Sequence, residues 1–196
     1  ALLGSTRFTL PLFFRTSTGQ NVSAGPYQVT LNFNVYYNIC QVGALGLCVT
    51  AQTNTVATTM QLNLTVTNDC ITINAPNVNF GSAPLVKNFP AISQAVSITC
   101  TKGSTYTVGI NNGSYANGNV RNMANGNNRL SYEIYKASTT NRWGSVGTER
   151  WASSASSSTS SDGLLRTYSY TARVLPTQST PPAGTYTDTV VVDIAF

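Results

Sequence analysis

Apolar and polar residues alternate along most of the chain. In YQVTLNFNVYY every second residue from Tyr27 to Tyr37 is apolar, and MQLNLTV, AVSITC, LSYEIY and YSYTARV repeat the pattern further on. A period of two places successive side chains on opposite faces of a strand. Turn-rich stretches such as NNGSYANGN separate these segments. The pattern predicts an all-β protein, an antiparallel β-sandwich or barrel.

The last predicted strand lies at the C-terminal end of the sequence. In VVVDIAF, apolar side chains of alternate residues share one face: Val190, Val192, Ile194 and Phe196. A terminal apolar strand without a following strand leaves an unpaired backbone edge and an uncovered apolar surface, which favour association with another strand. The alternative is a complete sandwich whose last strand happens to be terminal.

The layout of this strand also occurs near the N-terminus. Residues 24–35 (AGPYQVTLNFNV) and 183–194 (AGTYTDTVVVDI) both begin with Ala-Gly, have a Tyr two residues later and continue with alternating apolar residues. Each is typical of the closing strand of a domain. We expect residues 1–50 to be the C-terminal remnant of a β domain that begins before this sequence. Residues 51–57 are expected to form a linker, and residues 58–196 a second domain.

Composition excludes several function classes. The sequence has no His and only 9% charged residues, so Ser-His-Asp and Cys-His catalysis are ruled out. Glu133 and Glu149 are candidates for a glycosidase pair, but Glu133 alternates with Tyr132 and Ile134 and is expected to be a solvated strand residue. The net charge of +5 is spread without runs, unlike a nucleic-acid interface. We expect that the protein is not an enzyme, binds no cofactor or metal, and has no nucleic-acid partner.

Four cysteines indicate an oxidising compartment. Cys40, Cys48, Cys70 and Cys100 have no CxxC spacing, and an even number favours two disulfides. The loop CQVGALGLC is short enough to close locally through Cys40 and Cys48. The apolar residues of this loop and of the start ALLGS are candidates for an adhesive surface or an interdomain contact: Leu2, Leu3, Val42, Leu45 and Leu47. The Ser-rich segment 152–163 is expected to be a mobile loop.

Residues 58–196 resemble a known family throughout. TVTNDCITINAPNVNFGS, QAVSITCTKGSTYTVGINNG, VRNMANGNNRLSYEIYKASTTNRWGS and YTARVLPTQSTPPAGTYTDTVVVDIAF follow the order found in spore coat protein U domains. These are the pilin domains of archaic, Csu-type chaperone–usher pili. The landmarks are Cys70, Phe80-Gly81, Cys100-Thr101, Arg121 with Met123, Trp143-Gly144 and Gln178.

This resemblance implies an immunoglobulin-like antiparallel β-sandwich that lacks its last strand. A periplasmic chaperone would supply that strand, and the N-terminal strand of the next subunit would later replace it. The resemblance implies a disulfide between Cys70 and Cys100, and Cys40 is then expected to pair with Cys48 across their short loop. The expected groove has one wall made by the first strand of the domain and another made by the last strand. The expected residues are Leu62, Leu64 and Val66 on the first strand, and Val190, Val192, Ile194 and Phe196 on the last.

A further domain ahead of the pilin domain resembles the two-domain tip adhesin of such pili. The implied partners are the periplasmic chaperone, the outer-membrane usher, the next subunit, and an abiotic or host surface to which the fibre attaches during biofilm formation. The implied location is the periplasm in transit and then the cell-surface pilus. The alternatives are a spore or cell-surface coat protein without a pilus, and a carbohydrate-binding module. The second would need exposed aromatic residues, for which Trp151 is a candidate, whereas the resemblance makes Trp143 structural.

Overall fold

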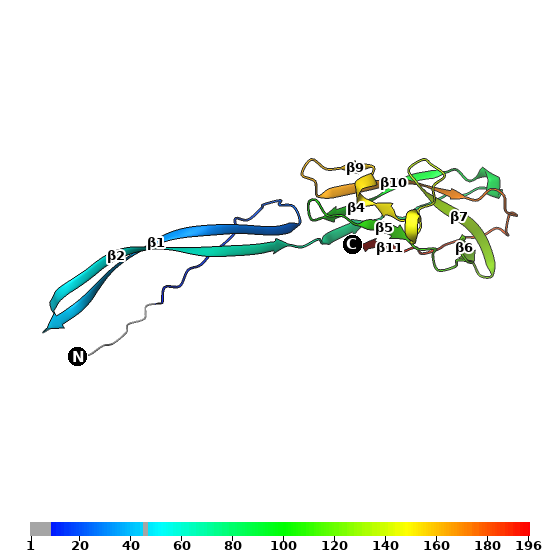
Figure 1. Cartoon of the computed structure of the whole chain (residues 1–196). Helices are drawn as coiled ribbons and strands as arrows, with labels where there is room; N and C mark the ends of the chain where they lie inside the picture. Colours follow the sequence, from blue (N-terminus) through cyan, green and yellow to red (C-terminus); the bar gives the residue numbers. More distant parts are fainter. Residues whose placement is uncertain (1–8, 45–46) are drawn as a thin grey trace.

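The computed structural model describes residues 9–44 and 47–196, which form a long β-hairpin attached to a β-sandwich (Figure 1). All strand pairs in this part of the chain are antiparallel. The short 3-10 helices are η1 (Val86–Asn88), η2 (Gly147–Glu149) and η3 (Ser153–Ala155). None of the helices in the described ranges has the length and hydropathy needed to cross a membrane.

The hairpin consists of β1 (Gly25–Ala44) and β2 (Leu47–Val66) and projects away from the sandwich (Figure 1). Directly paired residues share a face, so pairs such as Val29 with Leu62 and Val35 with Val56 form an apolar face. The opposite face carries mainly Asn, Gln and Thr. The hairpin is therefore an amphipathic two-stranded ribbon.

The expected linker at residues 51–57 is instead part of β2. Cys40 pairs with Ala51 and Asn34 pairs with Ala57, so the ladder with β1 runs through the whole segment. The small and polar composition that suggested a linker includes two Thr and one Val, β-branched residues that favour extended strands. Pairing with β1 therefore decides the conformation of this segment.

The sandwich has two sheets. The larger sheet has the order β3-β4-β10-β7-β6, with β9 also paired to β10, and the smaller sheet has the order β11-β5-β8. The larger sheet contains β3 (Cys70–Asn74), β4 (Ile92–Cys100), β6 (Arg121–Asn125), β7 (Asn128–Lys136), β9 (Ser158–Thr159) and β10 (Leu165–Val174). The smaller sheet contains β5 (Thr107–Ile110), β8 (Trp151–Ala152) and β11 (Val192–Ala195). This architecture confirms the predicted all-β fold.

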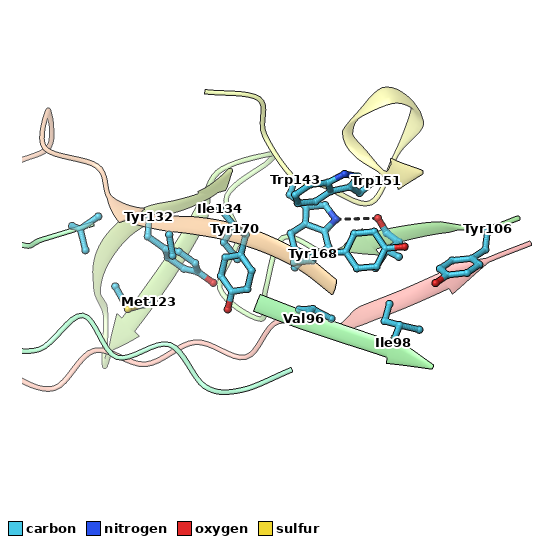
Figure 2. Close-up of a cluster of buried hydrophobic side chains, with 14 of the residues drawn as sticks. Val96, Ile98, Tyr106, Met123, Tyr132, Ile134, Trp143, Trp151, Tyr168 and Tyr170 are labelled. Carbon is cyan, nitrogen blue, oxygen red and sulfur yellow. Dashed lines mark hydrogen bonds between the residues drawn. The ribbon is translucent and has the colours of Figure 1, made fainter. Parts of the chain in front are cut away.

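Aromatic side chains fill the core between the sheets (Figure 2). The fully buried Trp143 ring lies 5.0 Å from that of Trp151 and 5.7 Å from that of Tyr170, in edge-to-face arrangements. The Trp143 indole N–H donates to the Val108 carbonyl at 3.0 Å. Because Trp151 is also buried, neither tryptophan offers a stacking surface for a sugar.

The Ser-rich segment is ordered, contrary to the expected mobile loop. It contains β8, η3 and β9. The buried Ser153 hydroxyl accepts the Tyr106 backbone N–H at 3.1 Å, and the Ser157 N–H donates to the Thr167 carbonyl at 2.8 Å. Small residues let this segment lie close to the sandwich, and their polar groups find backbone partners there.

Candidate functional site: an apolar groove between two open strand edges

An apolar groove of about 530 Å³ runs between the two sheets. Residues 75–80, which follow β3, form one wall, and residues 186–190, which precede β11, form most of the other. Figure 2 shows several of the floor side chains lying together. The floor and inner rim contain Val96, Ile110, Met123, Tyr132, Ile134, Tyr170, Ala172 and Val192.

Both walls of the groove have unpaired backbone. Among the residues that the structure describes, none is hydrogen-bonded to the backbone N–H and C=O groups of residues 77–80. The N–H groups of Asp188 and Val190 likewise find no partner in the described chain. Extended backbone with free hydrogen-bonding groups on each side of an apolar floor is suited to pairing with an added strand.

The backbone of the wall that precedes β11 is hydrogen-bonded on its outer side only. Thr187 exchanges two backbone hydrogen bonds with Ala124 of β6, at 2.8 and 3.1 Å. The Asn111 side chain accepts the Val191 N–H at 2.9 Å, and the Asn111 N–H donates to the Val191 carbonyl at 3.0 Å. Successive residues of a strand direct their backbone groups to opposite sides. Since Thr187 and Val191 bond on the outer side, the backbone groups of Asp188 and Val190 face the open side. The wall is therefore held in place without a strand in the groove.

A buried ion-pair network lies behind the groove. Arg121 is fully buried (0% exposed) and pairs with Glu133, which also accepts the Arg142 Nε–H at 2.7 Å. Arg142 in turn pairs with Glu149. Burial lowers the pKa of the Arg121 guanidinium, and the neighbouring Glu133 carboxylate opposes this change. The prediction that Glu133 is a solvated residue was wrong, because residues 142–149 cover its side of β7.

The expected groove residues divide into three groups. Val190 and Val192 line the groove. Ile194 packs against the core, while Phe196 is 64% exposed and contacts the Tyr106 ring edge-to-face. The three residues expected on the first strand do not reach the groove: Leu62, Leu64 and Val66 lie in β2, paired with β1.

Residues 75–80 take the place of that expected first-strand wall. Val78 and Phe80 pack against the core from this segment. The short alternating stretch NVNF was the sequence signal for the wall. It follows Pro76, and a Pro beside so short a segment makes it a weak strand signal. The stronger alternation in MQLNLTV belongs to the hairpin.

Both expected disulfides are present. Cys70–Cys100 joins β3 to β4, with the two Cα atoms 3.9 Å apart, and Cys40–Cys48 closes the outer end of the hairpin. Near that end Val42 is 56% exposed and Leu47 is 73% exposed. This end of the hairpin lies far from the sandwich (Figure 1), so these two residues form no contact with it. Leu2, Leu3 and Leu45 lie outside the described residues.

The fold and groove define a class of protein: a β-sandwich with an apolar groove between unpaired edges, as in pilin domains. The family model for the Spore Coat Protein U domain matches residues 56–193, and the chain belongs to this family. No curated protein matches the chain.

One solved structure that matches this chain also comes from a pilus system. It is described as the CsuC–CsuE chaperone–tip adhesion subunit pre-assembly complex from archaic chaperone–usher Csu pili of Acinetobacter baumannii. The match has 30% identity and a TM-score of 0.59, and it covers 92% of this chain and 62% of that one. The matches confirm the resemblance to Csu-type pilus subunits and indicate a structural protein, not an enzyme.

Proposed function

We propose that the chain is a subunit of a chaperone–usher pilus and that a strand from another chain completes its sandwich. The groove between two unpaired edges is the observation that carries this proposal. An added strand would gain backbone hydrogen bonds on both sides and bury apolar side chains, each contributing about 1.5–3 kcal/mol when fully buried. A periplasmic chaperone would provide the strand first, and the next subunit would replace it at the usher.

Two adjacent valines provide a matched test of the groove. Val190 lines the groove, whereas Val191 points away from it and is 55% exposed. Val190→Asp should abolish recovery of the chain with its chaperone, because a buried unpaired carboxylate is costly. Val191→Asp introduces the same charge one residue later and should leave recovery unchanged. Equal recovery of both variants, or a soluble wild-type chain that unfolds cooperatively without any partner, would contradict the proposal.

We propose further that the hairpin belongs to a second domain, placed at the fibre tip. Its apolar face is open: Tyr27, Val29, Val35, Val56 and Leu64 are all exposed. A two-stranded ribbon is at best marginally stable by itself. We therefore expect further strands, which would complete the second domain, to cover that face.

The outer end of the hairpin is the proposed adhesive surface. Exposed Val42 and Leu47 lie at the ends of two paired strands that the Cys40–Cys48 disulfide also joins, so docking on an apolar surface costs little conformational entropy. Leu2, Leu3 and Leu45 are further candidates from the sequence. Such contact would attach the cell-surface pilus to abiotic or host surfaces and so support biofilm formation.

Adhesion of fibres to polystyrene tests this assignment. Val42→Ser combined with Leu47→Ser should reduce attachment, while Val146→Ser, at an exposed valine of the sandwich, should not. Attachment should also persist at 1 M salt, where the Debye length is about 3 Å. Full attachment by the double variant together with loss at high salt would instead indicate an electrostatic surface. A coat protein without a pilus would show neither chaperone binding nor fibres.

A further inference from the structure

One wall of the groove carries a carboxylate among apolar side chains. Tyr186, Asp188, Val190 and Val192 are alternate residues of one extended segment, and all four line the groove. Alternate side chains of such a segment share a face. The apolar series on this face is therefore interrupted at a single position, Asp188.

The Asp188 carboxylate has only neutral hydrogen-bond partners. Its Oδ2 accepts the Tyr132 hydroxyl at 2.7 Å, and its Oδ1 accepts the Ser114 backbone N–H at 2.9 Å. Within the described part of the chain, no Lys or Arg forms an ion pair with it. Arg121, the buried cation behind this region, is already paired with Glu133. Burial, followed by the bond to Asp188, raises the pKa of Tyr132, so this hydroxyl remains a donor.

Filling the groove would remove water from this carboxylate. Two neutral hydrogen bonds compensate a buried charge only partly. An apolar side chain placed opposite Asp188 would leave the charge unpaired. A Lys or Arg would instead form a charge-assisted hydrogen bond, and its aliphatic stem would pack on the apolar floor.

We propose that the strand completing this groove carries one Lys or Arg opposite Asp188 and apolar residues at its other inward-facing positions. This inference rests on the proposed strand addition and specifies the partner's chemistry. Asp188 would also set the register, because a shift by one residue turns the cation outward and a shift by two moves it away from the carboxylate. The groove would thus select among strands that are equally apolar.

A purely structural role for Asp188 is the competing explanation. Its carboxylate accepts the Ser114 N–H and occupies the space that a side chain at position 113 would need, next to Gly113. Asp188 therefore attaches the loop that contains Gly113 and Ser114 to the wall of the groove. Asp188→Asn separates the two roles. The Asn oxygen can still accept the Ser114 N–H, and its amide can donate to the Tyr132 oxygen, while the negative charge is lost.

The test uses synthetic strand peptides, in whose presence the chain is refolded from denaturant. In the parent peptide every inward-facing position is norleucine, which has the length of the Lys stem without its ammonium group. In each variant peptide one of these positions is Lys, and in a second series it is Glu. Dissociation constants are measured for the wild-type chain, for Asp188→Asn, and for Asp162→Asn, which removes the same charge from an exposed loop.

We expect one Lys peptide to bind the wild-type chain about tenfold more tightly than the parent, a difference of about 1.4 kcal/mol. Glu at that position should weaken binding. The Lys advantage should disappear in Asp188→Asn and persist in Asp162→Asn. If the parent binds and no Lys peptide surpasses it, or if the advantage survives Asp188→Asn, this inference is wrong while strand addition stands. If no peptide binds at all, strand addition itself fails.

Discussion

Replacing Arg121 tests whether the buried ion-pair network holds the two sheets together. Its Nε–H donates to the Asn111 carbonyl at 2.9 Å, and its Nη2 donates to the Ile110 and Trp143 carbonyls at 2.8 Å each. Ile110 belongs to β5 of the smaller sheet, whereas Arg121 belongs to β6 of the larger one. The guanidinium therefore links the two sheets through one buried side chain.

Arg121→Met keeps an unbranched stem and removes every donor. Each buried carbonyl left without a partner costs about 1–3 kcal/mol. The Glu133 carboxylate would retain its ion pair with Arg142 and its hydrogen bond from the Ile134 N–H at 2.8 Å, so it would not be left without partners. Breaking a buried ion pair from one side typically costs about 3–5 kcal/mol. At roughly 2–4 °C per kcal/mol for a chain of this size, we expect Tm to fall by roughly 10 °C.

The measurement is thermal unfolding followed by near-ultraviolet circular dichroism, which reports on the buried Trp143. Wild type and variants are compared with the same saturating strand peptide. Arg129→Met is the control, since Arg129 is exposed on β7, and surface changes of this kind usually stay within about 0.5 kcal/mol. If Arg121→Met lowers Tm no more than Arg129→Met does, the network contributes little to holding the sheets together.

Two further predictions concern the disulfides and alkaline pH. Replacing Cys70 and Cys100 by Ser should destabilise the sandwich by about 2–4 kcal/mol in a denaturant titration, whereas replacing Cys40 and Cys48 should leave its midpoint unchanged, because that bond closes only the hairpin. Burial raises the pKa of Tyr132 above its ordinary value of 10.0. The unfolded chain then loses the phenolic proton before the folded one, so stability should be constant below about pH 9 and decrease above pH 10. If the denaturant midpoint rises between pH 10 and 11, the predicted direction of the pH dependence is wrong.

The strands could be predicted from the sequence because period-two alternation is local information. It identified β1, β2, β4, β7 and β10 and the inward face of the last strand. Pairing partners are not local, however. The alternation of Leu62 and Leu64 shows which residues share a face and says nothing about what covers it. Assigning them to the groove was wrong for this reason.

The burial of polar residues could not be predicted from the sequence either. Glu133 alternates with apolar neighbours, as a solvated residue would, and only the path of residues 142–149 encloses it. The Ser-rich segment looked unable to pack, yet the adjacent Trp151 is buried in the core and fixes its start. In both places a contact between residues distant in sequence overrides the local pattern. Asp188 differs, because its place in an otherwise apolar series is visible in the sequence once the groove is known.

The two incomplete surfaces of the chain require different partners. The groove has a floor and two walls, so a single extended segment fills it, and such a segment can arrive from another polypeptide and be exchanged. The β1–β2 ribbon offers one flat apolar face, which only a layer of several strands can cover. Ordering several strands from a separate chain would add association costs to those of folding, whereas strands of the same polypeptide avoid them. We therefore expect exchange between subunits to occur at the groove and the ribbon to be covered within its own chain.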